Sequence, residues 1–376
     1  MKLLDAAEQF ILENFEVISN SALLIYSSVQ PSTKQDGLLF KTFEHESVIK
    51  EQEAVRDLCI RVIPYPKTVR VITFSPDGTR IAIGGSQDSL IILDTSSTNV
   101  ISAHLEDLSH EVLSISFSPN ADRFISGDDH GIMHLWDAST LEVLHTVQSH
   151  VGWAHAVSFL PDGTRILSGG QDSWARIWDS SMQSTLVTID CRNAILTVAC
   201  LDNTRVICGC LDGTMLIWDP QDGRILHTVK SHTEMVRSLS VSPDGTHFVS
   251  GAQDGTVQLW DSLTTTVLDT LHLQAQILSV AFSHDGTYIV CGSRDCNTIL
   301  WSLLTQEVLA LGGHTMPIWA VSTSPHSNLI STGDGFGYVP GFVDPEAGDI
   351  RVWDPCLGMV PILEVHPTLT MVCVLV

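Results

Sequence analysis

Basic residues are scarce in this sequence. Lysine and arginine together number 19, against 43 aspartates and glutamates, and no lysine follows Lys230. Nucleic-acid backbones and anionic lipid surfaces are bound through concentrated positive charge. The net charge of −24 therefore predicts that the protein binds neither nucleic acid nor a membrane surface. It favours a partner with a basic surface, or it serves solubility alone.

Long apolar runs are also lacking. No run approaches the roughly 18 residues of a membrane span, and the apolar closing segment MVCVLV is far shorter. Asp5, Glu8 and Glu13 lie where a secretory signal would be uninterruptedly apolar, so no signal peptide is expected. The nine cysteines show no regular pairing intervals, which is typical of reduced thiols. We therefore expect a cytoplasmic protein, with the nucleus as the alternative.

Motifs of catalysis and cofactor binding are missing as well. The sequence has no GxxxxGK[ST] phosphate loop, no HExxH or GxSxG motif and no dinucleotide-binding glycine fingerprint. The nearest approach to a metal motif is Cys208-Gly-Cys210, which has the wrong spacing for zinc and no second pair. The sequence thus predicts no catalytic residue, no cofactor and no metal.

What the sequence does contain is a repeat of about forty residues. An apolar segment ends seven times in Trp-Asp or a degenerate copy, at intervals of 40 to 43 residues and finally 52. The copies begin at Leu93, Trp136, Trp178, Trp218, Trp260, Trp301 and Trp353. Such a period is typical of a four-stranded propeller blade, and recurring Pro-Asp-Gly turns mark the ends of the expected strands. The pattern predicts an all-β, seven-bladed β-propeller.

The propeller is expected over residues 61–376. Its repeats are placed at about 65–94, 104–137, 150–179, 190–219, 232–261, 272–301 and 314–354. Residues 58–63 are expected to supply an outer strand to the last blade, which would close the ring and remove exposed strand edges. The chain from His366 is similar to the start of an eighth repeat.

These repeats resemble the WD-repeat (WD40) family over most of the chain. In that family a His, a Ser or Thr, an Asp and the Trp of a blade form a buried hydrogen-bond network. The resemblance implies two complete networks, one in the third repeat and one in the fifth. Their members are His150, Ser168, Asp172 and Trp178, and His232, Ser250, Asp254 and Trp260. Because such sets recur from repeat to repeat, a structural role is favoured over catalytic triads.

The other repeats depart from this motif. Cys208 and Cys291 stand at the Ser position of repeats four and six, and His130, next to Asp129, stands at the Asp position of repeat two. Repeat one has Ile83 where the Ser is expected. We expect these networks to be incomplete.

Three tryptophans fall outside the repeat motif. Trp153 and Trp319 are expected near the start of inner strands, close to the propeller axis, and Trp174 beside a tight turn on the same face. Met235 and Arg237 occupy comparable positions in their repeat. In the family this face is the usual docking surface for proteins, and Trp is a frequent interface anchor. These residues are candidate partner contacts; the alternative is that the aromatic rings pack against their own loops.

The seventh repeat contains an insertion. With Ser331 taken as the serine of the motif, 22 residues separate it from Trp353, twelve more than in repeat five. The extra sequence occupies residues 336–348, and Phe336 and Tyr338 would extend the candidate docking face. A retained intron or a faulty gene model is the alternative origin of this segment.

Residues 1–60 are expected to form a helical extension. Apolar residues recur at three- and four-residue intervals up to Pro31 and again over residues 47–58. The segment AEQFILENFEVIS and the SALLIYSSVQP that follows resemble the linker before the WD repeats of fungal NACHT-WD proteins, which are signal-transducing NTPases. This resemblance implies a non-catalytic propeller that senses a ligand by protein–protein interaction. The NTPase module itself is lacking, and the alternative is a constitutive scaffold subunit of an intracellular complex.

Overall fold

The computed structural model describes residues 58–65, 67–86, 89–96, 100–103, 110–335 and 348–355. The expected helices of residues 1–57, the start of an eighth repeat at His366, and Phe336 and Tyr338 all lie outside these residues, so their predictions stay untested. The chain divides into two compact units, one of which, Cys59–Asp354, contains every described strand. No helix in the described part has the length and apolarity of a membrane span.

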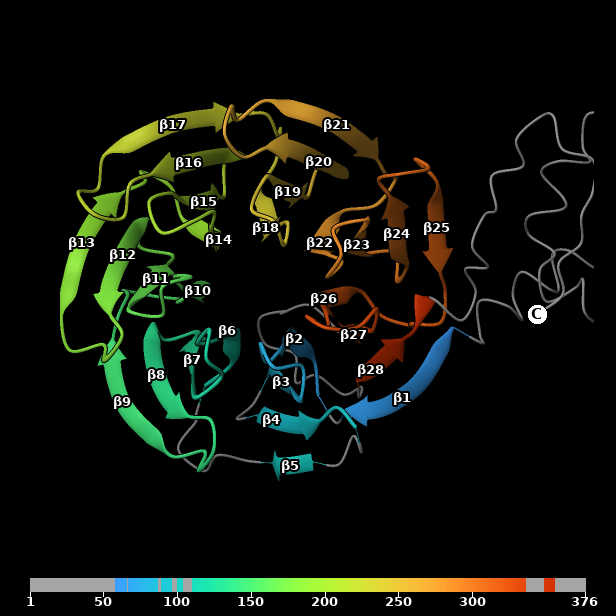
Figure 1. The fold of residues 1–376 in the computed structure, drawn as a ribbon, viewed down its shortest axis with the longest axis horizontal. Helices are drawn as coiled ribbons and strands as arrows, with labels where there is room; N and C mark the ends of the chain where they lie inside the picture. Colours follow the sequence, from blue (N-terminus) through green and yellow to red (C-terminus); the bar gives the residue numbers. More distant parts are fainter. Residues whose placement is uncertain are drawn as a thin grey trace, which may run out of the picture. The chain divides into compact units, whose positions relative to one another are not determined.

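The described part of Cys59–Asp354 forms seven antiparallel four-stranded sheets around a common axis (Figure 1). In six of the sheets four consecutive strands follow one another outward from the axis, and in the seventh β26, β27 and β28 are followed by β1 (Figure 1). The all-β, seven-bladed prediction is confirmed.

The strands of blades 1 to 4 are β2 (Val69–Phe74), β3 (Arg80–Gly85), β4 (Ser89–Asp94) and β5 (Val100–Ala103); β6 (Val112–Phe117), β7 (Arg123–Asp128), β8 (Ile132–Asp137) and β9 (Val143–Gln148); β10 (Ala156–Phe159), β11 (Arg165–Gly169), β12 (Trp174–Asp179) and β13 (Thr185–Asp190); and β14 (Ile195–Cys200), β15 (Val206–Cys210), β16 (Thr214–Trp218) and β17 (Ile225–Lys230). Those of blades 5 to 7 are β18 (Val236–Val241), β19 (His247–Ala252), β20 (Thr256–Asp261) and β21 (Val267–His272); β22 (Ile277–Phe282), β23 (Tyr288–Ser293), β24 (Thr298–Ser302) and β25 (Val308–Leu311); and β26 (Ile318–Thr323), β27 (Ile330–Asp334), β28 (Gly348–Trp353) and β1 (Cys59–Tyr65).

The hydrophobic core lies between neighbouring blades. Trp136 of blade 2, for example, belongs to one apolar cluster with Ala82 and Ile92 of blade 1. Strands such as β7 are covered on both faces and read as nearly continuous apolar runs, whereas the outer strand β9 alternates between half-buried and exposed residues. The repeat therefore folds because each blade buries its apolar faces against the next one.

Tight turns join the first and second strands of the blades. Gly245, in the turn of blade 5, has a φ of +70°, which glycine adopts without steric cost. Asp244 beside it accepts hydrogen bonds from Ser242 Oγ at 2.6 Å and from the Thr246 amide at 3.0 Å. These donors lower the pKa of Asp244 to about 2. The acidic residue of the Pro-Asp-Gly motif thus fixes the turn.

The first strand of the unit closes the ring. β1 pairs antiparallel with β28, with Ile63 opposite Ile350, and it completes the sheet of blade 7 (Figure 1). The predicted outer strand over residues 58–63 is confirmed and extends to Tyr65, whose side chain is buried. Closure pairs the third strand of the last blade, which would otherwise present an open sheet edge.

Candidate functional site

The hydrogen-bond network of blade 3 contains the four residues that the family resemblance implied. Asp172 lies 2.8 Å from His150 Nδ1, and Ser168 Oγ lies 2.8 Å from His150 Nε2. Trp178 Nε1 donates to Ser168 Oγ at 2.9 Å. Among these four residues, a neutral imidazole with its proton on Nδ1 matches each donor to an acceptor. Arg176 Nη1, which also lies near His150 Nδ1, donates to Asp172 at 3.0 Å. Ser168 therefore holds together the second and third strands and the loop that precedes the first.

Blade 5 forms the same core network with a different link to its aspartate. His232 Nε2 lies 2.7 Å from Ser250 Oγ, to which Trp260 Nε1 donates at 2.9 Å. His232 Nδ1 is 2.9 Å from the hydroxyl of Thr256, which in turn donates to Asp254 at 2.6 Å. Thr256, a residue outside the motif, thus bridges the histidine and the aspartate.

Blade 7 contains a third complete network, which the sequence reasoning missed. Ile330 pairs with Trp353, so Thr332, and not Ser331, occupies the position of the motif serine. Thr332 Oγ1 lies 2.6 Å from His314 Nε2 and accepts a hydrogen bond from Trp353 Nε1 at 2.9 Å, and Asp334 lies 2.8 Å from His314 Nδ1. Taking Ser331 as the motif serine was wrong by one residue. The separation from Trp353 is therefore 21 residues, and the insertion is shorter by one than expected.

The three networks are closed to solvent. Ser168, Ser250 and Thr332 have no exposed surface, and the histidines that they contact are also buried. Burial lowers the pKa of His150 and of His232, although the neighbouring aspartates act in the opposite direction. A nucleophilic hydroxyl must reach a substrate, and these hydroxyls instead accept the hydrogen of a buried tryptophan. Their geometry fits a role in blade stability.

Where the motif is degenerate, the replacements differ. In blade 4, Trp218 Nε1 donates to Cys208 Sγ at 3.3 Å, so the thiol takes the place of the hydroxyl. In blade 6, Trp301 Nε1 lies 3.4 Å from Gln306 Oε1 and makes no such bond to Cys291. The network therefore survives in part where a sulfur acceptor is within reach.

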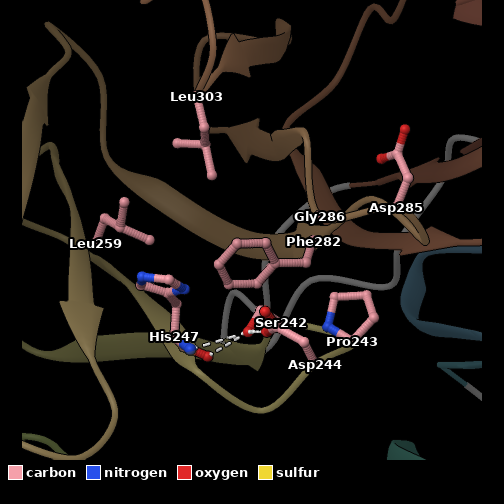
Figure 2. A pocket seen from close by; sticks show the side chains of 9 residues that line it. All are labelled: Ser242, Pro243, Asp244, His247, Leu259, Phe282, Asp285, Gly286 and Leu303. Carbon is pink, nitrogen blue, oxygen red and sulfur yellow. Dashed lines mark hydrogen bonds between the residues drawn. The ribbon is translucent and has the colours of Figure 1, made fainter.

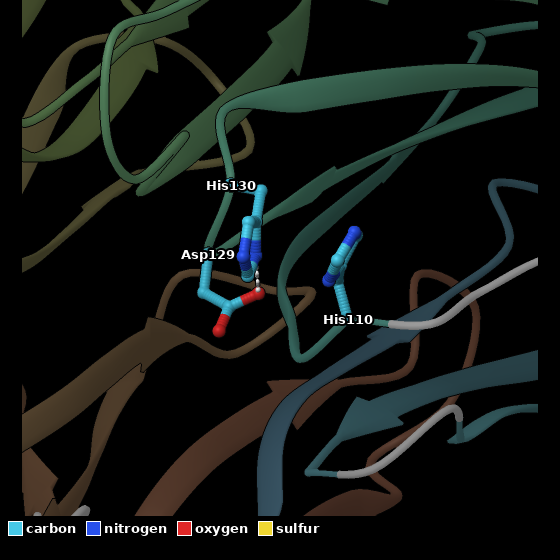
Figure 3. A group of neighbouring side chains, drawn as sticks. All are labelled: His110, Asp129 and His130. Carbon is cyan, nitrogen blue, oxygen red and sulfur yellow. Dashed lines mark hydrogen bonds and ion pairs between the residues drawn. The ribbon is translucent and has the colours of Figure 1, made fainter.

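Blade 2 has a buried carboxylate outside the motif position. By strand register His130 stands where Asp172 stands in blade 3, as the sequence indicated. The carboxylate of Asp128, two residues earlier, is buried and accepts the amide hydrogens of His130 at 2.9 Å and of Ile132 at 2.7 Å. His130 points outward and stacks on His110, with ring centroids 3.7 Å apart (Figure 3). The carboxylate that folds the turn therefore lies two residues before the motif position.

The stacked pair also bears on metal binding. His110, Asp129 and His130 each offer a ligand atom, and these atoms lie within 4.8 Å of one another (Figure 3). The two ring planes meet at only 25°. Because an imidazole lone pair lies in the plane of its ring, a single ion cannot lie close to both nitrogens in this arrangement. The geometry fits a stacked pair hydrogen-bonded to a carboxylate, with His130 Nδ1 3.0 Å from Asp129.

A β-bulge recurs at one position of the inner strands. The strand register shifts between the two residues that flank Arg70, Arg237 and Trp319, and likewise around Leu113, Leu196 and Leu278. His155 directly precedes β10. A bulge re-aims the side chain that it carries. These positions all lie at the end of the inner strands where the turns between second and third strands also lie, which we call the axial face.

Aromatic and charged side chains meet on the axial face. Arg70 Cζ lies 4.7 Å, and Arg237 Cζ 6.0 Å, from the centroid of the Trp319 ring. Trp319 Nε1 donates to the Gly335 carbonyl at 3.0 Å, and Arg70 forms an ion pair with Glu111. Blade 7 thus places an indole between guanidinium groups of blades 1 and 5.

Trp153 belongs to the same group of side chains. Its ring contacts that of His155 edge to face, with centroids 5.2 Å apart. Burial, and then the charge of Arg237, lower the pKa of His155 to about 4, so this histidine is neutral at physiological pH. We call the set of Arg70, Glu111, Trp153, His155, Arg237, Arg294 and Trp319 the axial cluster.

The remaining candidates are not members of the axial cluster or lie outside the described residues. Trp174 begins β12, the third strand from the axis, and is 38% exposed. Met235 is half-buried and its carbonyl accepts the Gln253 amide at 3.0 Å. Phe336 and Tyr338 lie outside the described residues. The role of all these residues in partner binding stays a prediction.

Comparison with known proteins decides the family. A family model described as "WD domain, G-beta repeat" matches residues 96–137, 141–179, 184–219, 223–261, 265–302 and 305–354. This chain belongs to the WD-repeat family. The matched ranges leave out β2, β3 and β4 of blade 1, whose repeat lacks the motif residues; these strands nevertheless form.

Among solved structures, the WD-repeat propeller is similar to the crystal structure of the RRP9 WD40 repeats. The TM-score is 0.67 at 18% sequence identity, with 77% of this chain and 97% of that chain covered. At this identity the likeness shows the fold alone. Among curated proteins no sequence matches.

Two pockets of the WD-repeat propeller lie at the face opposite the axial face. A pocket of about 340 Å³ is lined by the turns of blades 5 and 6, including Asp244, Phe282 and Asp285 (Figure 2). A pocket of about 300 Å³ lies at the corresponding place between blades 2 and 3. Their aspartates already accept hydrogen bonds within the turns, as Asp244 and Asp285 do. The repeat of the same hollow between other blades identifies it as a product of blade packing.

Sequence reasoning missed three members of the axial cluster: Arg70, Glu111 and Arg294. Arg70 occupies the same bulge position as Arg237 and Trp319. Blade 1 lacks the serine and tryptophan of the motif, and its Pro-Asp-Gly turn at residues 76–78 is the local signal that could have located Arg70. Glu111 precedes β6 and Arg294 follows β23, so both lie in loops. The sequence does not show which loops of different blades lie close to one another.

Proposed function

We propose that this chain is a non-catalytic module that binds a protein partner through its axial face. The observation that carries the proposal is Trp319, held between Arg70 and Arg237. Trp and Arg are the side chains that most often dominate interface energies, and a rigid bulge position costs little ordering entropy on binding. Proteins of the WD-repeat family generally bind protein partners, which supports this assignment.

The partner is a protein rather than nucleic acid or a membrane. The net charge of −24 disfavours binding to the extended negative surface of a nucleic-acid backbone or of an anionic membrane. We place the protein in the cytoplasm, with the nucleus as the alternative, on the basis of the reduced cysteines of the described part.

Within this module we assign the finer role of ligand recognition in a NACHT-WD-like signalling protein. The support is the resemblance of the segment before the propeller to the linker of those proteins. A constitutive scaffold subunit is the second candidate, and the same axial face would serve it. The two roles differ in whether partner binding changes the state of an attached module.

Affinity capture with axial-face variants tests the docking surface. Immobilised wild-type chain is compared with Trp319→Ala and Trp153→Ala, and with Leu263→Ala as control. Leu263 is 76% exposed in a turn between third and fourth strands, at the opposite face. We expect proteins retained by the wild type and the control to be lost from both tryptophan variants. Equal retention by all four would contradict the proposed surface.

A further inference from the structure

Three arginines gather at the axial cluster of a strongly acidic chain. Arg70 and Arg237 flank the Trp319 ring, with Cζ atoms 4.7 and 6.0 Å from its centroid. Arg294 follows β23 in the neighbouring blade, and its charge, like that of Arg70, acts on Arg237. Burial and these two like charges lower the pKa of Arg237. Arg70 and Arg237 are half-buried and Arg294 is exposed, so the cluster joins two partly desolvated positive charges to one at the surface.

The three guanidinium groups are neutralised unequally. Arg70 forms an ion pair with Glu111. Arg294 Nη1 donates to the neutral amide oxygen of Gln276 at 2.8 Å. In the part of the chain that the structure describes, no carboxylate lies within ion-pair distance of Arg237, and its buried Nε has no acceptor. Two positive charges therefore remain without a counter-charge among the described residues.

The contact with the Trp319 ring does not offset the cost of leaving Arg237 without a counter-charge. A cation–π contact is a modest attraction. A buried donor without an acceptor is unfavourable, and more so where it carries charge. Repulsion by Arg70 and Arg294 adds to that cost. A group of residues that is unfavourable in the isolated fold points to a ligand of opposite charge.

We propose that Arg237 and Arg294, assisted by Arg70 and Trp319, bind a phosphorylated serine or threonine of the protein partner. The proposal rests on the proposed function and names the chemistry of its partner. A phosphate monoester carries about −1.5 to −2 charges at pH 7, which matches two unneutralised guanidinium groups. Guanidinium forks pair with phosphate oxygens through two parallel hydrogen bonds.

A phosphate is favoured over a run of acidic side chains for a reason of charge distribution. The net charge of −24 repels an extended acidic segment along most of its length. A phosphate gathers its whole charge within reach of the cluster, so attraction there is not offset by repulsion elsewhere along the peptide. This surface therefore favours a single phosphate group over a run of acidic side chains.

Fluorescence anisotropy with peptide pools tests the proposal. The probes are degenerate peptides centred on phosphoserine or phosphothreonine, and matched pools with unmodified residues or with glutamate. We expect the full-length chain to bind the phosphorylated pools at least about tenfold more tightly, which corresponds to about 1.4 kcal/mol. Arg237→Gln should lose that preference, and Arg237→Lys should regain part of it.

Arg165→Gln is the matched control, because Arg165 pairs with Asp162 in a turn at the opposite face. It should bind the phosphorylated pools like the wild type. Thermal unfolding separates ligand binding from a structural role: Arg237→Gln should keep or raise the melting temperature, since it removes an uncompensated charge. A lower melting temperature, or equal binding of phosphorylated, unmodified and glutamate pools, would overturn the proposal.

Phosphatase treatment separates this inference from the proposed function. If a partner captured through Trp319 is released by phosphatase, both statements hold. If that partner is retained after phosphatase treatment, the axial face still docks a protein and the phosphate inference fails. If Trp319→Ala captures the same proteins as the wild type, the docking surface itself fails.

Discussion

Arg70 and Trp319 lie against each other across the seam where the ring closes. The Cζ atom of Arg70, on the first inner strand, is 4.7 Å from the ring centroid of Trp319, on the last one. Both side chains sit on bulges of equivalent inner strands. A contact between residues so distant in sequence exists only when the propeller is closed. The axial cluster is therefore a property of the complete ring rather than of any single blade.

Closure should depend on the first strand. Tyr65 is 2% exposed at the end of β1, so Tyr65→Ala should reduce the free energy of unfolding by about 3 kcal/mol or more. Val62, 45% exposed on the same strand, provides the control, and Val62→Ala should cost less than about 0.5 kcal/mol. Urea unfolding measures both. Equal and small effects would contradict a role of β1 in closing the ring.

The serine at the centre of the blade 3 network should be a stability determinant. Ser168→Ala leaves His150 Nε2 and Trp178 Nε1 without partners in a buried site, which should cost about 1–3 kcal/mol. Ser158→Ala, at a half-buried hydroxyl outside the network, is the comparison in the same blade. A loss no larger than that of the comparison in urea unfolding would argue against the network.

Blade 7 allows a test between adjacent hydroxyl residues. Thr332→Val keeps the side-chain shape but removes the hydroxyl that contacts His314 and Trp353, and it should cost about 1–3 kcal/mol. Ser331 is equally buried, yet its hydroxyl has no hydrogen-bond partner, so Ser331→Ala should be neutral or slightly stabilising. Thermal unfolding of the two variants decides the register. The opposite order of stabilities would restore Ser331 as the motif residue.

The pH dependence of stability follows from three buried histidines. Burial lowers the pKa of His150 and of His232 from 6.5, and burial with the charge of Arg237 lowers that of His155 to about 4. Below pH 6.5 the unfolded chain binds protons that the folded chain does not. Stability should therefore be complete above pH 6.5 and fall as the pH is lowered toward 4.

Urea unfolding at a series of pH values measures this dependence. His155→Gln, which cannot take up a proton in the unfolded chain, should flatten the slope between pH 6.5 and 4. Thr185→Gln, at an exposed position of the outer strand β13, adds the same side chain without removing a titratable group and should leave the slope unchanged. A stability that rises on acidification through this window would contradict buried neutral histidines.

The sequence predicted the blades well because each repeat carries its own local signals. Trp178, Trp260 and the Pro-Asp-Gly turns recur at fixed intervals, and their spacing is sufficient to place strands. The sequence-based prediction was wrong where two neighbouring residues could fill one position. Ser331 and Thr332 are adjacent hydroxyl residues, and only the strand register distinguishes them. In blade 2 the motif position holds His130, and the sequence alone did not show that Asp128, two residues earlier, supplies a buried carboxylate.

The candidate site was less predictable for a different reason. Trp153, Arg237 and Trp319 were found because each stands at a recognisable offset from a repeat motif. Arg70 and Arg294 contribute through charges that act across blades, and no local pattern records which blades are neighbours at the axis. The hydroxyl of Thr256 links His232 to Asp254 in addition to the direct contact of 3.4 Å between His232 Nδ1 and Asp254, and the motif alone does not indicate this link.

The most direct test of the central claim is site-specific photo-crosslinking on the axial face. A photoreactive phenylalanine analogue replaces Met235, which lies beside Arg237, in one sample and Leu263, at the opposite face, in another. We expect a discrete crosslinked protein from position 235 that is absent when Trp319→Ala is introduced into the same chain. Crosslinking of the same protein from position 263 but not from position 235 would show that the partner docks elsewhere on the propeller.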